Sequence, residues 1–253
     1  MIAPKSMARI VGLLFIVGTV SGILSGSFLA PYLTIPADGA AYQSLVATNE
    51  PQFVTGVLLI LLMGFSLAFI PIVLYPLLRR YSESLAMGYV VFRGGLEFVA
   101  YLALVGILLT VLAVSTGPGP RGESAIQSLR VLLGGYDVVY GVLLTIVFAV
   151  GALLLYDVLY RSRLIPRWLS GWGLVAAVLW LAWGLIVLVG LSNTAATVQL
   201  GAAVPVETLF ALPIALQELV MAVWLLVRGF EESSIVGGAT GVAPAAAAPD
   251  VGS

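Results

Sequence analysis

The sequence predicts an all-α integral membrane protein, built as one bundle of six transmembrane helices. Of its 253 residues, 61% are hydrophobic and only 9% are charged, and the mean hydropathy is +1.12. Residues 10–37 and 51–78 carry no charge, and each run exceeds the roughly 20 apolar residues that cross a bilayer as a helix. Further apolar runs of this kind fill most of the chain, which predicts a multi-pass protein of the cell membrane.

Three spans are expected in the first half of the chain. The first, at about residues 8–30, follows a short tail at residues 1–8, and a polar loop leads to the second, at about residues 52–78. Pro71 and Pro76 should kink the second helix, because proline lacks an amide hydrogen and its ring clashes with the preceding turn. Ser84 is a candidate N-cap for the third helix, which should end near residue 114, before a turn rich in glycine and proline.

The second half should supply the other three spans. Arg130 and Asp137 precede a clean uncharged run at residues 138–156, so the fourth helix is expected to extend past the bilayer at its outer end. The fifth begins near Pro166, a favoured first-turn residue, and ends near residue 192. The sixth covers about residues 205–227 and contains Pro213.

Beyond the last helix, residues 231–253 are rich in small residues and proline and are predicted to form a disordered cytoplasmic tail, since they cannot build a core. Residues 9–230 then make up the membrane domain. The distribution of basic residues predicts its orientation, because cytoplasmic loops carry an excess of lysine and arginine. Eight basic residues lie near the helix ends on the side of the termini: Lys5, Arg9, Arg79, Arg80, Arg161, Arg163, Arg167 and Arg228. Arg121 and Arg130 lie on the other side, so both termini are predicted to be cytoplasmic.

Missing residue types exclude several kinds of chemistry. The chain has no cysteine and no histidine, which removes thiol redox chemistry, Cys/His zinc sites and serine–histidine hydrolysis. Lys5 is the sole lysine, so a Schiff base within the membrane is excluded. We therefore expect no enzymatic activity, no cofactor and no metal site, and the net charge of −1 gives no reason to expect nucleic-acid binding.

Three ionisable residues fall within the predicted spans. Arg93 and Glu97 are four residues apart on one helical face, about 12 and 18 Å from the start of the third helix, and Glu218 lies about 15 Å from the end of the sixth. A charge at the bilayer centre costs on the order of 2.5–3.5 kcal/mol, so all three should face the bundle interior and meet there. Two carboxylates against one guanidinium leave one negative charge. The cluster is therefore a candidate ligand or proton site, although a structural network of the same residues explains the pattern equally well.

Asp137 is a further candidate, toward the outer half of the fourth helix. With Tyr136, Tyr140 and Glu207 it could line an external vestibule, and the alternative is that these residues simply lie at the membrane interface. Arg130 is two helical turns from Asp137, so it shares that face and is expected to screen the carboxylate.

Gly18, Gly22 and Gly26 repeat a spacing of small residues that lets another helix approach closely. A partner helix within the chain is favoured, and a homo-oligomer stays open. Four tryptophans mark the fifth helix: Trp168, Trp172, Trp180 and Trp183. The first two are predicted interface anchors, and for the deeper two plain packing is favoured over an aromatic pocket. The basic loop at residues 161–167 is predicted to meet anionic lipid headgroups.

Four segments resemble a known family: residues 9–14 (RIVGLL), Phe92–Arg93 with Glu97, residues 160–168 (YRSRLIPRW), and Gln217–Glu218 with residues 224–225 (WL) and 229–230 (GF). They are similar to the family catalogued as domain of unknown function 4386, over roughly residues 9–230. The resemblance implies a prokaryotic multi-pass membrane protein and brings no established activity.

Two classes of function are favoured, and a membrane enzyme using the two carboxylates and the arginine for acid–base work is a third, which no nucleophile or metal set supports. In the first, the interior cluster binds or transports a small molecule or an ion, with proton coupling as one form, and the proline breaks permit gating. In the second, the protein is a scaffold or sensor that transports nothing and binds membrane lipids or a partner membrane protein.

Overall fold

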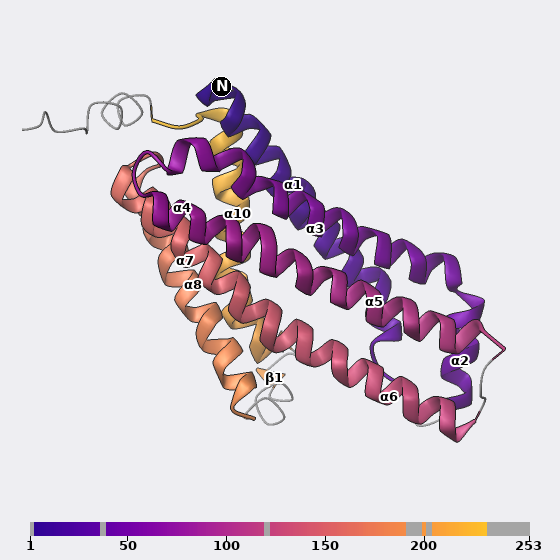
Figure 1. Ribbon diagram of the computed structural model, residues 1–253. Helices are drawn as coiled ribbons and strands as arrows, with labels where there is room; N and C mark the ends of the chain where they lie inside the picture. Colours follow the sequence, from indigo (N-terminus) through magenta and orange to yellow (C-terminus); the bar gives the residue numbers. More distant parts are fainter. Residues whose placement is uncertain (1–2, 36–38, 119–121, 191–198, 201–203, 232–253) are drawn as a thin grey trace, which may run out of the picture.

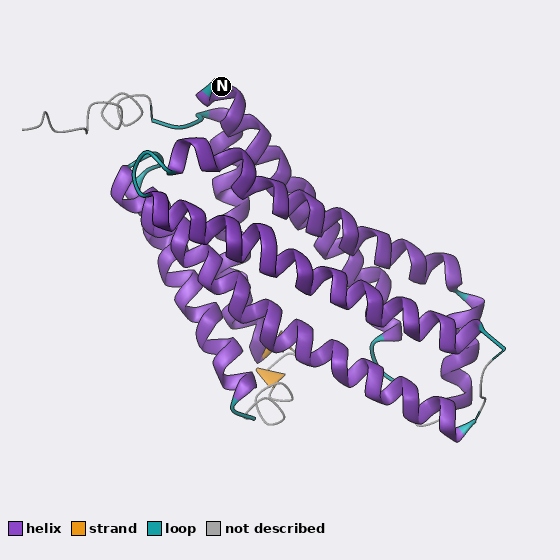
Figure 2. Cartoon of the chain, viewed as in Figure 1, coloured by secondary structure: helices purple, strands orange, loops and turns teal. Residues whose placement is uncertain are grey.

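The computed structural model describes residues 3–35, 39–118, 122–190, 199–200 and 204–231, which form an elongated α-helical bundle (Figures 1 and 2). Six of its helical rods are long and apolar enough to cross a membrane. The predicted all-α class and the number of spans are therefore confirmed. Their length and composition indicate a multi-pass membrane protein.

Several rods combine more than one helical element. The spans are α1 (Pro4–Leu29) with the 3-10 turn η1 (Ala30–Tyr32), α3 (Glu50–Leu78), α4 (Glu83–Tyr89) with η2 (Val90–Leu96) and α5 (Glu97–Thr116), α6 (Glu123–Val138) with η3 (Val139–Leu144) and α7 (Thr145–Ser162), α8 (Arg167–Leu188) and α10 (Val206–Val227). Both η2 and η3 are π-helical. A short helix α2 (Gly39–Thr48) and two paired two-residue strands, β1 (Gln199–Leu200) and β2 (Val204–Pro205), lie between spans.

The six rods form a closed ring in chain order. Each packs against the next along the chain, and α10 closes the ring by packing against α1. The N-terminus and the end of α10 lie at the same end of the bundle (Figure 1). A side chain directed toward the ring axis can therefore reach helices that are not its neighbours in the ring.

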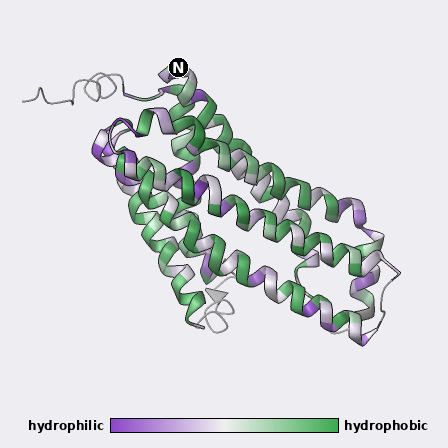
Figure 3. Ribbon diagram, viewed as in Figure 1, coloured by the Kyte–Doolittle hydropathy of each residue, from purple (hydrophilic) through white to green (hydrophobic). Residues whose placement is uncertain are grey.

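The outward surface of the bundle is apolar. Along α3 the exposed hydrophobic residues recur every three or four positions: Leu58, Leu62, Phe65, Phe69 and Ile72. Such a stripe is unusual on a water-soluble protein and is what a lipid-facing surface requires. Hydrophilic residues gather mainly at the two ends of the bundle (Figure 3).

Some predicted boundaries were wrong. Helix α1 begins at Pro4, a favoured first-turn residue, rather than near residue 8. The N-cap of α4 is Ser82, whose hydroxyl accepts the amide of Leu85, and Ser84 lies inside the helix. Helix α3 continues through Pro71 and Pro76 as one helix. The predicted tail lies outside the described residues from residue 232 onward, and the loop before α10 does so in large part.

Two rods are longer than a bilayer requires, and they extend at the end of the bundle opposite the N-terminus (Figure 1). The rods Glu83–Thr116 and Glu123–Ser162 contain 34 and 40 residues, or about 51 and 60 Å of helix against a hydrocarbon thickness of about 30 Å. The prediction that the fourth helix extends past the bilayer is in keeping with this length. Helix α2 was predicted to be a polar loop. It packs at this end against α3, α5 and α6. Tyr42 and Gln43 anchor α2, because they donate hydrogen bonds to the carbonyls of Tyr32 (2.7 Å) and Val114 (3.2 Å).

The glycines of α1 pack against α3, as the favoured in-chain reading expected. A Cβ at Gly18 would lie 2.7 Å from Leu67, and one at Gly22 would lie 2.7 Å from the sulfur of Met63. Gly26 differs, because a Cβ there would meet no atom within 4 Å. The third glycine of the repeat therefore faces open space rather than a neighbouring helix.

Candidate functional site

The site is built around Arg93, which lies in the middle of the π-helical segment η2 and is 1% exposed. Its Nη2 donates a 3.0 Å hydrogen bond to Oε1 of Glu218, and its Nη1 lies 3.3 Å from Oε2 of Glu97. The guanidinium carbon is 4.4 Å from the ring centre of Phe148 and 6.0 Å from that of Phe15. One buried cation thus connects its own rod with α1, α7 and α10, and the predicted meeting of the three charged residues is confirmed.

On one side of Arg93 the cluster is closed. Glu97 is 0% exposed, and its Oε1 accepts a 3.2 Å hydrogen bond from the hydroxyl of Tyr101, one turn further along α5. Among the described residues, Nε and Nη1 of Arg93, Oε2 of Glu97 and the hydroxyl of Tyr89 have no hydrogen-bond partner, although Nη1 and Oε2 are paired by charge. Networks that serve structure alone generally satisfy all their members.

On the other side the cluster borders a cavity of about 550 Å³. Glu218 is less buried than its partners, at 12% side-chain exposure, and lines this cavity together with Tyr101. All six rods contribute to the wall. The lining also includes Ile23 of α1, which is 65% exposed.

One face of α10 runs the length of the cavity. Glu207, Ala211, Ile214, Ala215 and Glu218 all line it, at intervals of three, four or one residues, which is the spacing of a single helical face. The separation of Glu207 from Glu218 corresponds to about 16 Å along the helix axis. The cavity therefore extends from the start of α10 to the charged centre.

The fourth rod provides the opposite wall. Tyr136, Asp137 and Tyr140 belong to this wall, and the two tyrosine rings stack with their centres 5.9 Å apart. The carbonyl of Tyr140 accepts a hydrogen bond from Thr145 Oγ1, five residues away, across the wide turn of η3. Asp137 and Glu207, which the sequence placed together at the outer end, thus share one cavity with Glu218.

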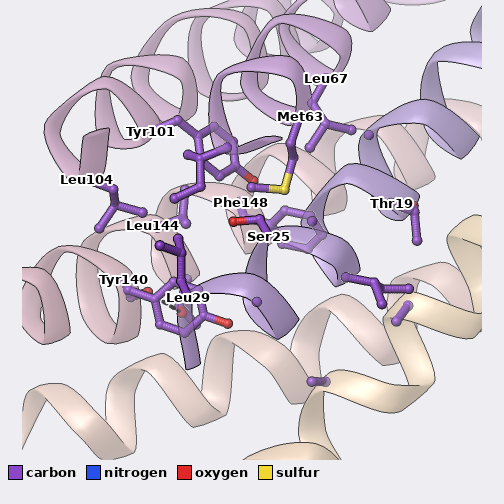
Figure 4. Close-up of a pocket in the computed structure, with 18 of the residues that line it drawn as sticks. Thr19, Ser25, Leu29, Met63, Leu67, Tyr101, Leu104, Tyr140, Leu144 and Phe148 are labelled. Carbon is purple, nitrogen blue, oxygen red and sulfur yellow. Dashed lines mark hydrogen bonds between the residues drawn. The ribbon is translucent and has the colours of Figure 1, made fainter. Parts of the chain in front are cut away.

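A serine hydroxyl in this wall has no partner. Ser25 is 3% exposed and lines the cavity, and it makes no hydrogen bond with the described residues. Figure 4 shows the side chains of Ser25, Met63 and Tyr101 turned toward the same space. Ser25 could not be selected from the sequence, because serine in an apolar helix often bonds only to its own backbone.

Two polar residues of the site, Tyr101 and Gln217, were not predicted, although each carries a signal in the sequence. Tyr101 continues the four-residue spacing of Arg93 and Glu97, so its place on their face was readable. Gln217 was noted only for its resemblance to the family. It accepts a hydrogen bond from the hydroxyl of Tyr156 and donates one of 3.1 Å to the carbonyl of Leu169, which joins α7, α8 and α10 beside the charged cluster.

Other predicted features divide between packing and the cavity. Arg130 is exposed and does not line the cavity, so the expected screening of Asp137 is not seen in the described part of the chain. Trp183 is buried and stacks on Phe210, with ring centres 5.5 Å apart. Trp180 lines the cavity. The favoured packing interpretation holds for Trp183, and Trp180 belongs to an aromatic cavity wall.

Comparison with protein families matches residues 10–229 to the family described as domain of unknown function (DUF4386). The chain belongs to the DUF4386 family. Comparison with curated proteins and with solved structures gives no match. The cavity and its charged centre lie inside the segment that defines DUF4386.

The motif at residues 160–168 of this DUF4386 protein shapes the turn between α7 and α8. Arg163 ends α7 in the left-handed conformation with φ 56°, and Leu164 and Ile165 are 0% exposed. Arg167 lies over the ring of Tyr160 at 5.2 Å. The amide of Glu231 donates to the carbonyl of Leu164 at 3.0 Å, so the chain after α10 returns to this turn. Much of the motif is thus explained by folding.

The site presents several kinds of chemical group to a ligand. Among the described residues, no group of three or more acidic side chains could hold a metal ion. The lining provides carboxylates, phenols, hydroxyls and aromatic rings. These groups are suited to recognising a ligand by charge and shape.

Proposed function

We propose that this DUF4386 protein binds a small molecule in the cavity between its six rods and moves it across the membrane. The observation that carries the proposal is the cavity of about 550 Å³, which ends at Glu218 in the charged centre. That volume lies within the range of sites for small molecules. An ionisable group at membrane depth that faces a cavity most often marks a substrate or ion path.

Arg93 has a positioning role in this proposal. Its hydrogen bond fixes Glu218 at the end of the cavity, and its ion pair with Glu97 holds the guanidinium from behind. With both acids ionised the cluster carries one net negative charge. Glu218 is then the group through which a ligand charge or a proton would be sensed.

Movement requires breaks in the helices that line the cavity. Pro213 lies in α10 between the lining residues Ala211 and Ile214, where it removes a backbone hydrogen bond. The π-helical η3 carries Tyr140 and Leu144, also in the wall. Both features are places where a membrane helix can bend at modest cost.

The basic residues support an orientation with both termini in the cytoplasm, in the cell membrane. The acidic residues Asp137 and Glu207 would then lie toward the outside. The cavity would be the outward-facing form of a binding site whose closed end is at Glu218.

A second candidate is a membrane scaffold or sensor that transports nothing. The observation that favours it is the closed side of the cluster, where Arg93 and Glu97 are buried to 1% and 0% exposure and join several helices. In that case the cluster holds the bundle together, and lipids or a partner protein occupy the outer surface.

Thiol labelling can decide between the two. The chain has no cysteine, so Ala215→Cys places a single thiol in the cavity wall. Leu216→Cys is the matched control, because Leu216 is the next residue, is 44% exposed and does not line the cavity. A small membrane-impermeant thiol reagent added outside should modify Ala215→Cys at least about tenfold faster, since the reactive thiolate needs water.

A plug tests that the reagent arrives through the cavity. Gly26→Phe should fill the open space beside Gly26 and slow the labelling of Ala215→Cys, and Gly106→Phe, at an open site outside the cavity, should not. Labelling from both faces of the membrane supports transport, and labelling from the outer face alone supports binding without transport. Equally slow labelling at both thiols would contradict the proposal and favour the scaffold.

A further inference from the structure

The charged side chains in the cavity wall all have the same sign. Among the described residues, Asp137, Glu207 and Glu218 line it, and no lysine or arginine does. Arg93 lies behind Glu218 and is 1% exposed, so it offers no free cation to the cavity. The wall therefore creates a negative potential in an environment that weakens charge interactions much less than water does.

Aromatic rings supply a second attraction for positive charge. Five of them line the cavity: Tyr101, Tyr136, Tyr140, Phe148 and Trp180. The faces of such rings attract ammonium groups, and cages of this kind recognise quaternary ammonium ligands. Phe148 already has the guanidinium of Arg93 at 4.4 Å, which shows a cation held against a ring of this wall.

The remainder of the wall is mainly apolar. Leu29, Ile60, Met63 and Leu67 contribute hydrocarbon and sulfur surface. Ser25, which makes no hydrogen bond with the described residues, turns its hydroxyl into the same space. A ligand that fits must bring an apolar body as well as a charge.

We propose that the cavity accepts an amphiphilic organic cation, meaning a singly charged amine or quaternary centre on an apolar body. The positive centre lies among the carboxylates and aromatic rings, and the apolar body contacts α1 and α3. This inference rests on the proposed binding function and names its ligand class. It also gives Asp137 and Glu207 a role, since they attract the cation at the outer end.

Other ligand classes fit less well. An organic anion would meet three carboxylates and no lining base. A bare metal ion would need acids closer together, and the described residues contain no such group. A neutral lipid would use the apolar wall but bring no positive charge to Asp137 and Glu207, at a cost in free energy.

The test uses two ions of the same shape and opposite charge. Tetraphenylphosphonium and tetraphenylborate are measured for equilibrium binding to the full chain in nanodiscs of zwitterionic lipid, with empty nanodiscs as background. Saturable binding of the phosphonium, and none of the borate, is expected. Equal binding of both ions, or binding of the borate alone, would overturn the inference.

Variants locate the binding. Glu207→Gln should weaken phosphonium binding by about threefold to tenfold, the loss expected for one charge about 6 Å away in a wet site. Glu123→Gln, an exposed acid outside the cavity, should not change it. Gly26→Phe should abolish binding and Gly106→Phe should preserve it, with melting temperatures confirming that each variant is folded. An unaltered affinity in folded Gly26→Phe would also overturn the inference.

The labelling of Ala215→Cys separates the two proposals. If the thiol reacts quickly and phosphonium protects it, both stand. If it reacts quickly and is protected by neither ion, the cavity is open but the ligand class is wrong. If it reacts no faster than Leu216→Cys, the proposed function fails and this inference falls with it.

Discussion

Neutralising Glu218 gives the sharpest test of which side of the charged cluster has a function. Glu218→Gln keeps the shape of the side chain and an oxygen that can still accept the 3.0 Å bond from Arg93. Arg93 also keeps its ion pair with Glu97. The substitution therefore changes the charge at the end of the cavity with little change in packing.

The size of the effect follows from geometry. A thiol at position 215 is three residues from Glu218 on one helical face, with about 6 Å between the Cβ atoms. A unit charge at about 6 Å contributes about 0.7 kcal/mol at a dielectric constant of about 80, and about 1.4 kcal/mol at about 40. Reagents of opposite charge shift in opposite directions, so the ratio of their rates should change by about tenfold to 100-fold.

The assay compares a trimethylammonium and a sulfonate thiol reagent on Ala215→Cys. The cationic reagent should react faster on the parent, and Glu218→Gln should reduce that preference by the factor given above. Glu123→Gln, at an exposed site outside the cavity, should leave the ratio unchanged. A ratio that Glu218→Gln does not alter would refute the reasoning, because no negative charge at Glu218 would then be felt in the cavity.

Thermal unfolding in detergent tests whether the charged cluster stabilises the fold. Glu97→Gln weakens an ion pair that is entirely buried, so it should lower stability by about 1–3 kcal/mol and change the reagent ratio less than Glu218→Gln does. If Glu218→Gln shifts only the melting point, and leaves ligand binding and pH-dependent flux in proteoliposomes unchanged, the cluster is structural and the scaffold reading is preferred.

Three further predictions concern topology and packing. A periplasm-active reporter should work when inserted within residues 117–121 and fail after Phe230; activity after Phe230 would mean that the termini lie outside. Gly18→Leu should lower the melting temperature, because overpacking costs about 1–3 kcal/mol, and Gly106→Leu, at an open site, is the control whose equal loss would contradict this. Tyr42→Phe should lower the free energy of unfolding by about 1 kcal/mol. Burial raises the pKa of Tyr42 from 10.0 to about 12, so the tyrosine should be more stabilising than phenylalanine below pH 10 and lose this advantage as the pH rises from 10 to 12. A difference in melting temperature that stays constant over this pH range would contradict the prediction.

The membrane bundle was predictable from the sequence, because a long uncharged run forms few stable structures other than a transmembrane helix. The segment Gly39–Thr48 was wrongly predicted to be a loop, because ten residues between polar flanks do not distinguish a short helix from a loop. The buried Tyr42 that anchors this helix became visible only with its partner on η1. Ser82 and Ser84 were equally suitable caps by type, and backbone geometry selected Ser82.

Depth along the helices was enough to predict that Arg93 meets Glu218. The cavity beside them was not predictable, because it depends on how six rods leave space between them. Ser25 shows the difficulty: its residue type and spacing resemble those of Ser21, yet Ser25 lines the cavity and Ser21 does not. The π-helical turns have no sequence signature either, so the inward faces of two rods could be placed only approximately.

Each π-helical turn divides its rod into two α-helical halves, and the turn sets the rotation of one half about the helix axis relative to the other. A π-helical turn holds about one residue more than an α-helical turn, and one residue corresponds to about 100° of rotation. Deleting one residue from Val90–Leu96 would restore an ordinary helix and turn α5, with Glu97 and Tyr101, by about 100° relative to α4, while the rod kept its apolar composition. The bundle could then still enter a membrane and yet lose its charged centre, so insertion into the bilayer and assembly of the site are separable properties of this chain.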